Sequence, residues 1–230
     1  MSFCHNIRKE TDRYFEASFH HPFVKGMVDG TLPIEKFAYY MLQDAYYLKH
    51  YAKVLALTAV KAESGAYMDI FLEKAQFIQQ SELALHATVF KELGIPEEKV
   101  NSFRPAPAAY NYISHMYQAV YNGDAAESLA AMLPCPWLYQ EIGAYYRDTK
   151  PGVKVYEEWI QMYSDCAFER SVEEQIEMMD RYADENRHKS SILKEHFLRS
   201  CYYEWQFWEM SWTMQDWERE VGKHGLIEHS

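Results

Sequence analysis

Glycine and proline are scarce in this chain, and nearly all of the sequence between them follows the helical repeat. There are 9 Gly and 8 Pro in 230 residues. Apolar side chains between these residues recur at three- and four-residue spacing, and no series of short alternating strands is present. The pattern predicts an all-α, single-domain helical bundle of about eight helices. We expect residues 1–219 to form this domain and residues 220–230 to be a disordered C-terminal tail.

Turn and capping residues set the expected helix limits. Pro33 is expected in a first helical turn with Thr31 as its cap, and Ser171 is expected to cap a later helix. The longest irregular stretch is predicted at residues 95–107. The predicted helices span about residues 2–20, 33–63, 66–93, 108–121, 124–146, 155–165, 172–183 and 190–218, with a short helix after Pro22.

The charge balance limits the classes of partner. With 34 acidic and 23 basic residues the formal net charge is −11, which disfavours nucleic acid and anionic membrane surfaces. No apolar run approaches the roughly 18 residues of a membrane span. The N-terminal residues lack the apolar segment of a secretory signal, so we expect a cytoplasmic protein with free thiols. Aromatic residues form 16% of the chain, enough to fill a helical core and to line a pocket for a flat small molecule.

Asp44 interrupts an aromatic stripe. Phe37, Tyr40, Tyr47 and Tyr51 surround it at three- and four-residue spacing, and residues at this spacing share one face of a helix. Burying a carboxylate in such a face is costly unless it is hydrogen-bonded. Asp44 is therefore either a functional carboxylate of a pocket or a structural one, held by tyrosine hydroxyls or by another helix.

Cys135 lies between two prolines, Pro134 and Pro136. Two prolines inside a helical pattern remove backbone donors and force a kink. Tyr139 shares a face with the thiol if the helix resumes after the kink. A reactive thiol needs access and polar support, and a kink can offer both. Cys135 is therefore either a nucleophile or a small buried side chain packed at a kink.

Glu204 lies in a stripe of large apolar side chains. Phe197, Cys201, Trp208 and Ser211 share its helix face. Desolvation in such a place raises the pKa of a carboxyl group, as a general acid near neutral pH requires. The structural alternative is an ion pair between Glu204 and an Arg or Lys of another helix.

Two pairs of glutamate and histidine raise the alternative of a metal protein. Glu82 and His86 are four residues apart, and Glu185 and His188 have the three-residue spacing of ferritin-like dimetal bundles. Those bundles need further carboxylates, and both pairs here have polar surroundings typical of a half-exposed face. We expect no metal site. Since no glycine-rich phosphate loop is present, we also expect no nucleotide cofactor.

Three motifs, in this order and separation, resemble the thiaminase II (TenA) family, whose members have a haem-oxygenase-like all-α fold without haem. They are QDAYYL at residues 43–48, PCPWLY at 134–139 and EWQFWEM at 204–210. The resemblance covers nearly the whole chain, from HPFV at residues 21–24 to Trp212. The family has one branch with a cysteine and one without it, and Cys135 makes the chain similar to the first.

The resemblance implies an aminopyrimidine aminohydrolase without cofactor, commonly a homotetramer. Such enzymes hydrolyse 4-amino-5-aminomethyl-2-methylpyrimidine, and also thiamin, to the hydroxymethyl pyrimidine in thiamin salvage. It implies Cys135 as nucleophile, Glu204 as acid and Asp44 as the carboxylate that meets the aminopyrimidine edge. The implied walls of the pocket are Tyr47, Tyr112, Tyr139, Tyr163 and Phe207. The alternatives are a non-catalytic aminopyrimidine carrier and a haem-oxygenase-like metal-binding oxidase.

Overall fold

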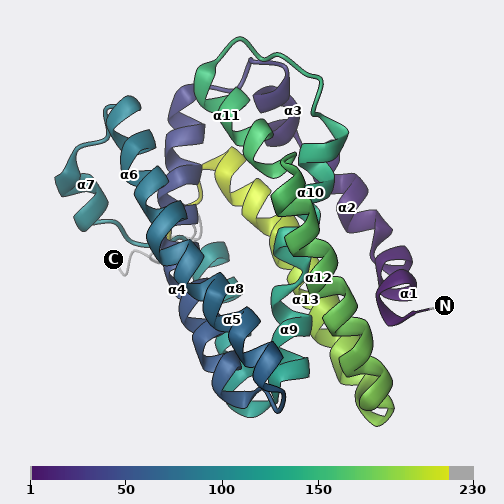
Figure 1. Cartoon of the computed structure of the whole chain (residues 1–230). Coiled ribbons are helices and arrows are strands. Elements are labelled where there is room, and N and C mark those ends of the chain that lie inside the picture. The colour runs from purple at the N-terminus through teal and green to yellow at the C-terminus, as the bar shows by residue number, and fades with distance from the viewer. Residues whose placement is uncertain (1, 218–230) are drawn as a thin grey trace, which may run out of the picture.

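The computed structural model describes residues 2–217, without the side chains of residues 81–85, and this part of the chain contains helices and no strand (Figure 1). The helices are α1 (Phe3–Glu10), α2 (Asp12–Phe19), α3 (Pro22–Val28), α4 (Ile34–Lys61), α5 (Gly65–Phe77), η1 (Ile78–Glu82), α6 (Leu83–Glu92), α7 (Glu97–Asn101), α8 (Pro107–Asn122), α9 (Ala125–Met132), α10 (Pro134–Tyr145), α11 (Lys154–Tyr163), α12 (Cys166–Glu185), η2 (Arg187–Lys189) and α13 (Ser190–Thr213). The predicted all-α class is confirmed. The predicted tail at residues 220–230 lies outside the described residues.

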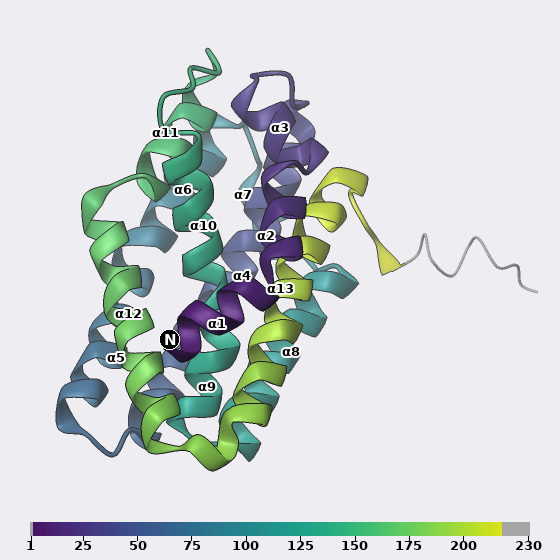
Figure 2. The same ribbon diagram turned by 90° about the vertical axis from the view of Figure 1, so that its right-hand side faces the viewer.

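The two longest helices, α4 and α13, form the centre of the bundle. Helix α4 packs on α5, α8 and α9, and α13 packs on α8, α9, α10 and α2. Figures 1 and 2 show α1 and α2 on the outside, against α12 and α13. Tyr40 of α4 and Trp208 of α13 are fully buried and stack with ring centroids 5.8 Å apart. Burial of such rings stabilises the pairing of the two helices.

The helices are more numerous than the predicted eight or so, because long periodic segments are broken by local features. The predicted first helix is divided at Thr11, the C-cap of α1, whose hydroxyl donates to the carbonyl of Ile7 over 2.8 Å. The segment predicted at residues 66–93 is interrupted by the π-helix η1. The stretch predicted as irregular contains the short helix α7, and the last helix ends at Thr213, before a left-handed Met214.

Both predicted caps were wrong. Helix α4 begins at Ile34 with Pro33 as its N-cap and without a side-chain cap. Thr31 lies two residues before the N-cap, in a turn where its backbone N–H donates to the carbonyl of Gly26. Helix α12 begins at Cys166, and the carboxylate of Asp165 caps it by accepting from the N–H of Ala167 over 2.7 Å. Ser171 therefore lies inside α12, past its first turn. Within the described residues, none of the helices is both long and apolar enough to cross a membrane.

Candidate active site

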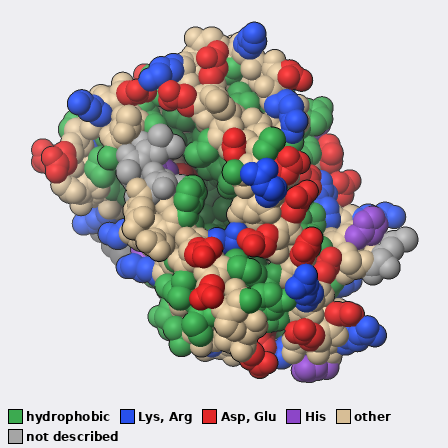
Figure 3. Space-filling view, viewed as in Figure 1, with side chains coloured by type: hydrophobic (Ala, Val, Ile, Leu, Met, Phe, Trp, Pro, Cys, Tyr) green, Lys and Arg blue, Asp and Glu red, His purple; other side chains and the backbone are tan. Residues whose placement is uncertain are grey.

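A cavity of about 900 Å³ opens between two groups of helices, with α4, α5 and α6 on one side and α10, α11 and α12 on the other. Figure 3 shows it as a hollow with many hydrophobic side chains at its edges. Four of the predicted site residues line it, and they come from three different helices: Asp44, Cys135, Tyr139 and Tyr163. The sequence pattern therefore identified residues that the fold brings to one place.

The predicted kink positions Cys135. Helix α9 ends at Met132 and α10 begins at Pro134, where a proline in the first turn costs no helical hydrogen bond. Pro136 cannot donate to the carbonyl of Met132, and the hydroxyl of Tyr51 lies 3.4 Å from that oxygen and donates to it instead. Cys135 is half-buried in the first turn of α10, where the positive end of the helix dipole favours a thiolate.

The other cysteines have different surroundings. Cys4 and Cys201 are buried, and burial raises the pKa of both thiols far above the ordinary value. Cys166 is exposed at the start of α12. Cys135 differs from all three because it lines this cavity, at a helix N-terminus and with its side chain only half-buried.

Glu204 contacts Cys135 from behind the cavity wall. Its side chain is 2% exposed. The hydroxyl of Tyr112 donates to Oε1 of Glu204 over 2.7 Å, and Cys135 and Glu204 share a further hydrogen bond. Burial raises the pKa of Glu204 to about 8, although these hydrogen bonds act in the opposite direction. Among the described side chains no Arg or Lys forms an ion pair with Glu204, so the structural alternative of such a pair is wrong.

Asp44 contacts His86, a residue that the sequence pattern suggested only as a metal ligand beside Glu82. Its buried carboxylate lies 2.8 Å from Nε2 of His86, which is also buried. His86 was considered only as a half-exposed metal ligand, and that expectation of its surroundings was wrong. Glu185 and His188 are exposed, and Glu82 is outside the described side chains. Among the side chains that the structure describes, no group of three or more His, Cys, Asp or Glu could hold a metal ion.

The five predicted aromatic residues form two groups, and the rings within each group are in contact. Tyr139 and Tyr163 line the cavity with ring centroids 4.8 Å apart. Tyr47, Tyr112 and Phe207 are buried behind it, with the ring of Tyr47 5.1 Å from that of Tyr112 and 5.8 Å from that of Phe207. The structure therefore brings all the predicted site residues together, but only some of them face open space.

Several lining residues were not predicted. Leu48, Tyr51 and Leu55 extend the stripe of Asp44 along α4 at helical spacing, and this spacing was a usable signal. Other lining residues come from α5, α6 and α12, among them Phe77, Val89 and Phe168. No sequence motif links these residues to Cys135, because only the packing of distant helices makes them neighbours.

Comparison with known proteins decides the family. Residues 8–214 match the model of the TENA/THI-4/PQQC family. The chain belongs to this family. It is 41% identical to the aminopyrimidine aminohydrolase of Bacillus subtilis (strain 168), with 100% of each chain covered. The solved TenA homologue from P. horikoshii OT3 is 30% identical, with 93% of this chain and 99% of that one covered and a TM-score of 0.86.

A more distant structural neighbour confirms the predicted fold type. A domain of unknown function with a haem oxygenase-like fold from Shewanella denitrificans OS217 superposes with a TM-score of 0.69 at 17% identity, covering 98% of this chain and 95% of that one. At this identity the similarity describes the fold alone. The haem-oxygenase-like bundle predicted from the motifs is thus confirmed.

Proposed function

We propose that the protein is an aminopyrimidine aminohydrolase of the thiaminase II type. It hydrolyses 4-amino-5-aminomethyl-2-methylpyrimidine, and thiamin, to 4-amino-5-hydroxymethyl-2-methylpyrimidine in thiamin salvage. The curated relative from Bacillus subtilis, similar over the full length, supports the reaction. The observation that carries the proposal is the contact between Cys135 and the buried Glu204 at the wall of an aromatic cavity. A carrier that only bound the ring would need no such pair.

The first step uses the contact between thiol and carboxyl. Cys135 shares a hydrogen bond with Glu204, so the carboxylate of Glu204 takes the thiol proton directly and becomes the acid of the next step. Cys135 adds as thiolate to C6 of the pyrimidine ring, forming a C–S bond. Glu204 then gives its proton to a ring nitrogen, which takes up the electron pair displaced into the ring by the new C–S bond. Covalent addition divides one difficult displacement into easier steps and requires no metal.

The second half of the reaction restores the enzyme. Electrons from the ring expel the amine, or the thiazole of thiamin, and leave an exocyclic methylene on C5. Water adds to this methylene, the C–S bond breaks, and the thiolate and the aromatic ring are regenerated. For the aminomethyl pyrimidine, the sum is one water consumed, with the hydroxymethyl pyrimidine and ammonia released. For thiamin, whose thiazolium is cationic, one water is consumed and the hydroxymethyl pyrimidine, the neutral thiazole and a proton are released. Glu204 donates a proton and later recovers one, which suits a carboxyl group whose pKa lies near the working pH.

Binding is assigned to Asp44 and the aromatic residues. The exocyclic amine of the pyrimidine donates to the Asp44 carboxylate, which lines the cavity. Tyr139 and Tyr163 present ring surface to the substrate, while Tyr47, Tyr112 and Phe207 support Glu204 and Cys135 from behind. A flat heterocycle between such rings is held by apolar burial and by a few oriented polar groups.

We further propose a cytoplasmic homotetramer, as the family resemblance implies. Helices α8 and α13 pack together and expose Tyr110, Tyr121 and Tyr202 by 49%, 66% and 44%. Exposed aromatic residues of this kind are common at protein interfaces. Light scattering after size-exclusion chromatography checks this, and a monomer at micromolar concentration would contradict it.

Product analysis tests the reaction. Purified protein is incubated separately with the aminomethyl pyrimidine and with thiamin, and the products are identified by mass spectrometry in H₂¹⁸O. We expect the hydroxymethyl pyrimidine from both substrates, with one ¹⁸O atom in its hydroxyl group. The ratio of the two turnover rates separates salvage from degradation. If the protein binds the pyrimidine without consuming it, it is the carrier instead.

A further inference from the structure

Asp44 and His86 form a buried pair to which the chemistry above assigns no role. The side chains are 7% and 6% exposed, and His86 Nε2 lies 2.8 Å from Asp44 Oδ2. Asp44 is on α4 and His86 is on α6, two helices in direct contact. Helix α6 also contributes Thr88 and Val89 to the cavity wall, so the helix that carries His86 is part of the same site.

The pair settles the hydrogen-bonding character of Asp44. A buried carboxylate is costly unless charge or hydrogen bonds compensate it. Among the side chains that the structure describes, His86 is the one basic group within ion-pair distance of Asp44. An ionised carboxylate only accepts hydrogen bonds, so beside an ionised Asp44 the donor is Nε2–H of His86 and the acceptor is Oδ2. A donating His86 holds Asp44 in the acceptor state, and the Asp44 side chain also lines the cavity.

We infer that His86 is a positioning residue that makes the site select 4-amino over 4-oxo pyrimidines. The inference rests on the proposed function and specifies how its substrate is recognised. An exocyclic amine donates to the Oδ1 of an acceptor-only Asp44. A 4-oxo group would instead place its carbonyl oxygen, an acceptor, against the acceptor oxygen of Asp44. Neither oxygen would then have a hydrogen-bond donor, which is costly in a buried site. His86 does not touch the substrate. It acts by denying Asp44 the proton that would turn Oδ1 into a donor.

Other features of the pair agree with this role. The contact joins residues 42 positions apart in sequence across two helices, and it lies on the Asp44 side of the cavity, whereas Glu204 approaches Cys135 from α13. Recognition of the ring edge and attack on the ring are therefore assigned to different helices. A change at His86 is expected to affect binding of the amino edge more than the step at Cys135.

Calorimetric binding of two ligands tests the inference. The probes are 4-amino-5-hydroxymethyl-2-methylpyrimidine and its 4-oxo counterpart, measured on the wild-type protein, His86→Phe and His86→Gln. Phenylalanine keeps the ring volume without a donor, and glutamine keeps an N–H donor. Sites that hydrogen-bond a substrate group reject the mismatched analogue strongly, so we expect the wild type to favour the amino ligand by about 100-fold or more.

The two variants should then separate. His86→Phe should lower the preference for the amino over the oxo ligand at least about tenfold, and it should raise KM for the aminomethyl pyrimidine more than it lowers kcat. His86→Gln should keep this preference within about threefold of that of the wild type. The matched control is His115→Phe, at another buried histidine away from the cavity, and it should leave the preference unchanged. An unaltered preference in a folded His86→Phe protein would overturn the inference.

A measurement on the wild type keeps the test valid if His86→Phe does not fold. In protein labelled with ¹⁵N-histidine, Nε2 of His86 should carry a hydrogen both before and after the amino ligand binds, and His86→Gln identifies the signal. A bare Nε2 in the complex would contradict the inference. Failure of the proposed function can be told apart from failure of this inference. If the wild-type protein consumes neither the aminomethyl pyrimidine nor thiamin, both the proposed function and the inference are rejected. If the wild type is active but its preference for the amino ligand does not depend on His86, the inference alone is rejected.

Discussion

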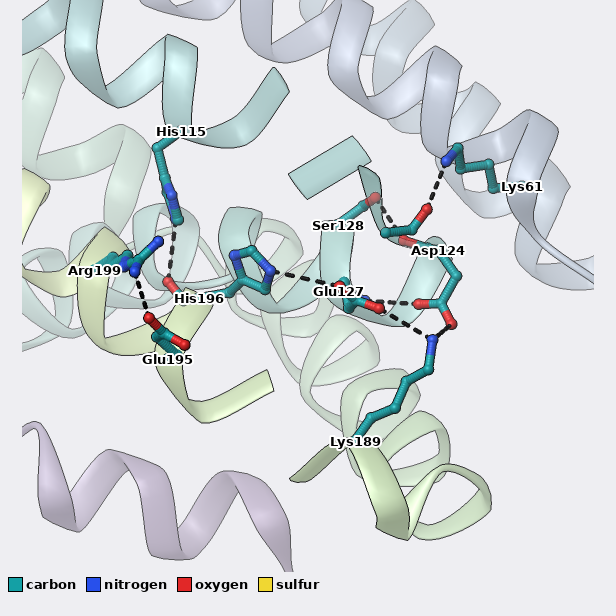
Figure 4. Close-up of polar contacts among 10 residues, drawn as sticks. Lys61, His115, Asp124, Glu127, Ser128, Lys189, Glu195, His196 and Arg199 are labelled. Carbon is teal, nitrogen blue, oxygen red and sulfur yellow. Dashed lines mark hydrogen bonds and ion pairs between the residues drawn. The ribbon is translucent and has the colours of Figure 1, made fainter. Parts of the chain in front are cut away.

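A buried histidine lies beside a carboxylate in several regions of this bundle, and two of these regions differ in what balances the charge. In the first, at and behind the cavity wall, Asp44 meets His86, and Glu204 meets Tyr112 and Cys135. The second is a polar cluster at the junction of α9, η2 and α13 (Figure 4). There Glu127 accepts from Lys189 over 3.0 Å and lies 3.6 Å from His196, and Asp124 also accepts from Lys189.

The difference separates a structural cluster from a site able to do chemistry. In the polar cluster Lys189 bonds both carboxylates and so ties η2 to α9. Burial acts to raise the pKa of Asp124, but the hydrogen bond from Lys189 lowers it. In the cavity Glu204 has no such cation among the described side chains, and burial raises its pKa to about 8. A carboxyl group in this state can exchange a proton near neutral pH. A cationic partner thus removes a carboxylate from proton transfer, and neutral partners keep it available.

Among the changes that compare the two carboxylate regions, the largest effect is expected from Glu204→Gln. The amide preserves the shape and the contact with Tyr112 but cannot exchange a proton, so kcat should fall by about 10²–10³-fold while the pyrimidine still binds. Steady-state kinetics and calorimetry on the same preparation measure the two quantities. Glu127→Gln, in the polar cluster, is the control and should keep its kcat. Full activity in Glu204→Gln would remove the assignment of Glu204 as the acid.

The second prediction concerns pH and the same carboxyl group. Its pKa is about 8 in the folded protein and about 4.5 when unperturbed, so folding favours the protonated form. This contribution to stability is complete below about pH 4.5 and is lost as pH rises toward 8, with a slope of at most about 1.4 kcal/mol per pH unit. Urea unfolding across this range should show the slope in the wild type and a reduced slope in Glu204→Gln. Parallel curves would contradict it.

Lys189→Met should disturb stability and not activity. The change leaves Glu127 and Asp124 without their cation, but Asp124 is partly exposed, so solvent screening limits the loss to about 1–2 kcal/mol. Urea unfolding and kcat are the two measurements. The control is Lys194→Met, which breaks an exposed pair with Glu10 and should cost less than about 0.5 kcal/mol. A fall in kcat parallel to the loss of stability would show that the two regions are coupled.

The smallest effect is expected on stability at low pH, from the buried histidines at and beside the polar cluster. Burial lowers the pKa of His115 to about 4 and also lowers the pKa of His196, so the folded protein favours the neutral rings. This stability is complete above about pH 6.5 and is lost as pH falls toward 4. His115→Gln keeps a donor for the carbonyl of His196 without an ionisable ring and should flatten the decline by less than about 1.4 kcal/mol per pH unit. An unchanged decline would refute it.

Helical periodicity predicted much of the site, because it acts within one helix. Asp44 and Glu204 were recognised as carboxyl groups in buried stripes, and Cys135 as a residue at a proline kink, and the structure confirms the burial and the kink. Tyr112 and Tyr163 depended on the family resemblance. In the structure, Tyr112 donates to Glu204, and Tyr163 lines the cavity.

What sequence reasoning could not supply were contacts between distant helices and breaks within long ones. The pairing of His86 with Asp44 needs the packing of α6 on α4, and the nearby Glu82 suggested a different partner. The breaks at Thr11 and at η1 depend on local hydrogen bonds that leave apolar periodicity intact. The roles of the predicted site residues stay predictions until the variants are measured.

The central claim is that Cys135 is the nucleophile, and substitution of this thiol tests it most directly. Turnover of the aminomethyl pyrimidine is measured on the wild type, on Cys135→Ser and on Cys166→Ser, whose thiol is exposed at the start of α12. We predict a loss of at least about 10³-fold in Cys135→Ser and an unchanged rate in Cys166→Ser. Turnover by Cys135→Ser within tenfold of the wild type, in a folded protein, would contradict the account.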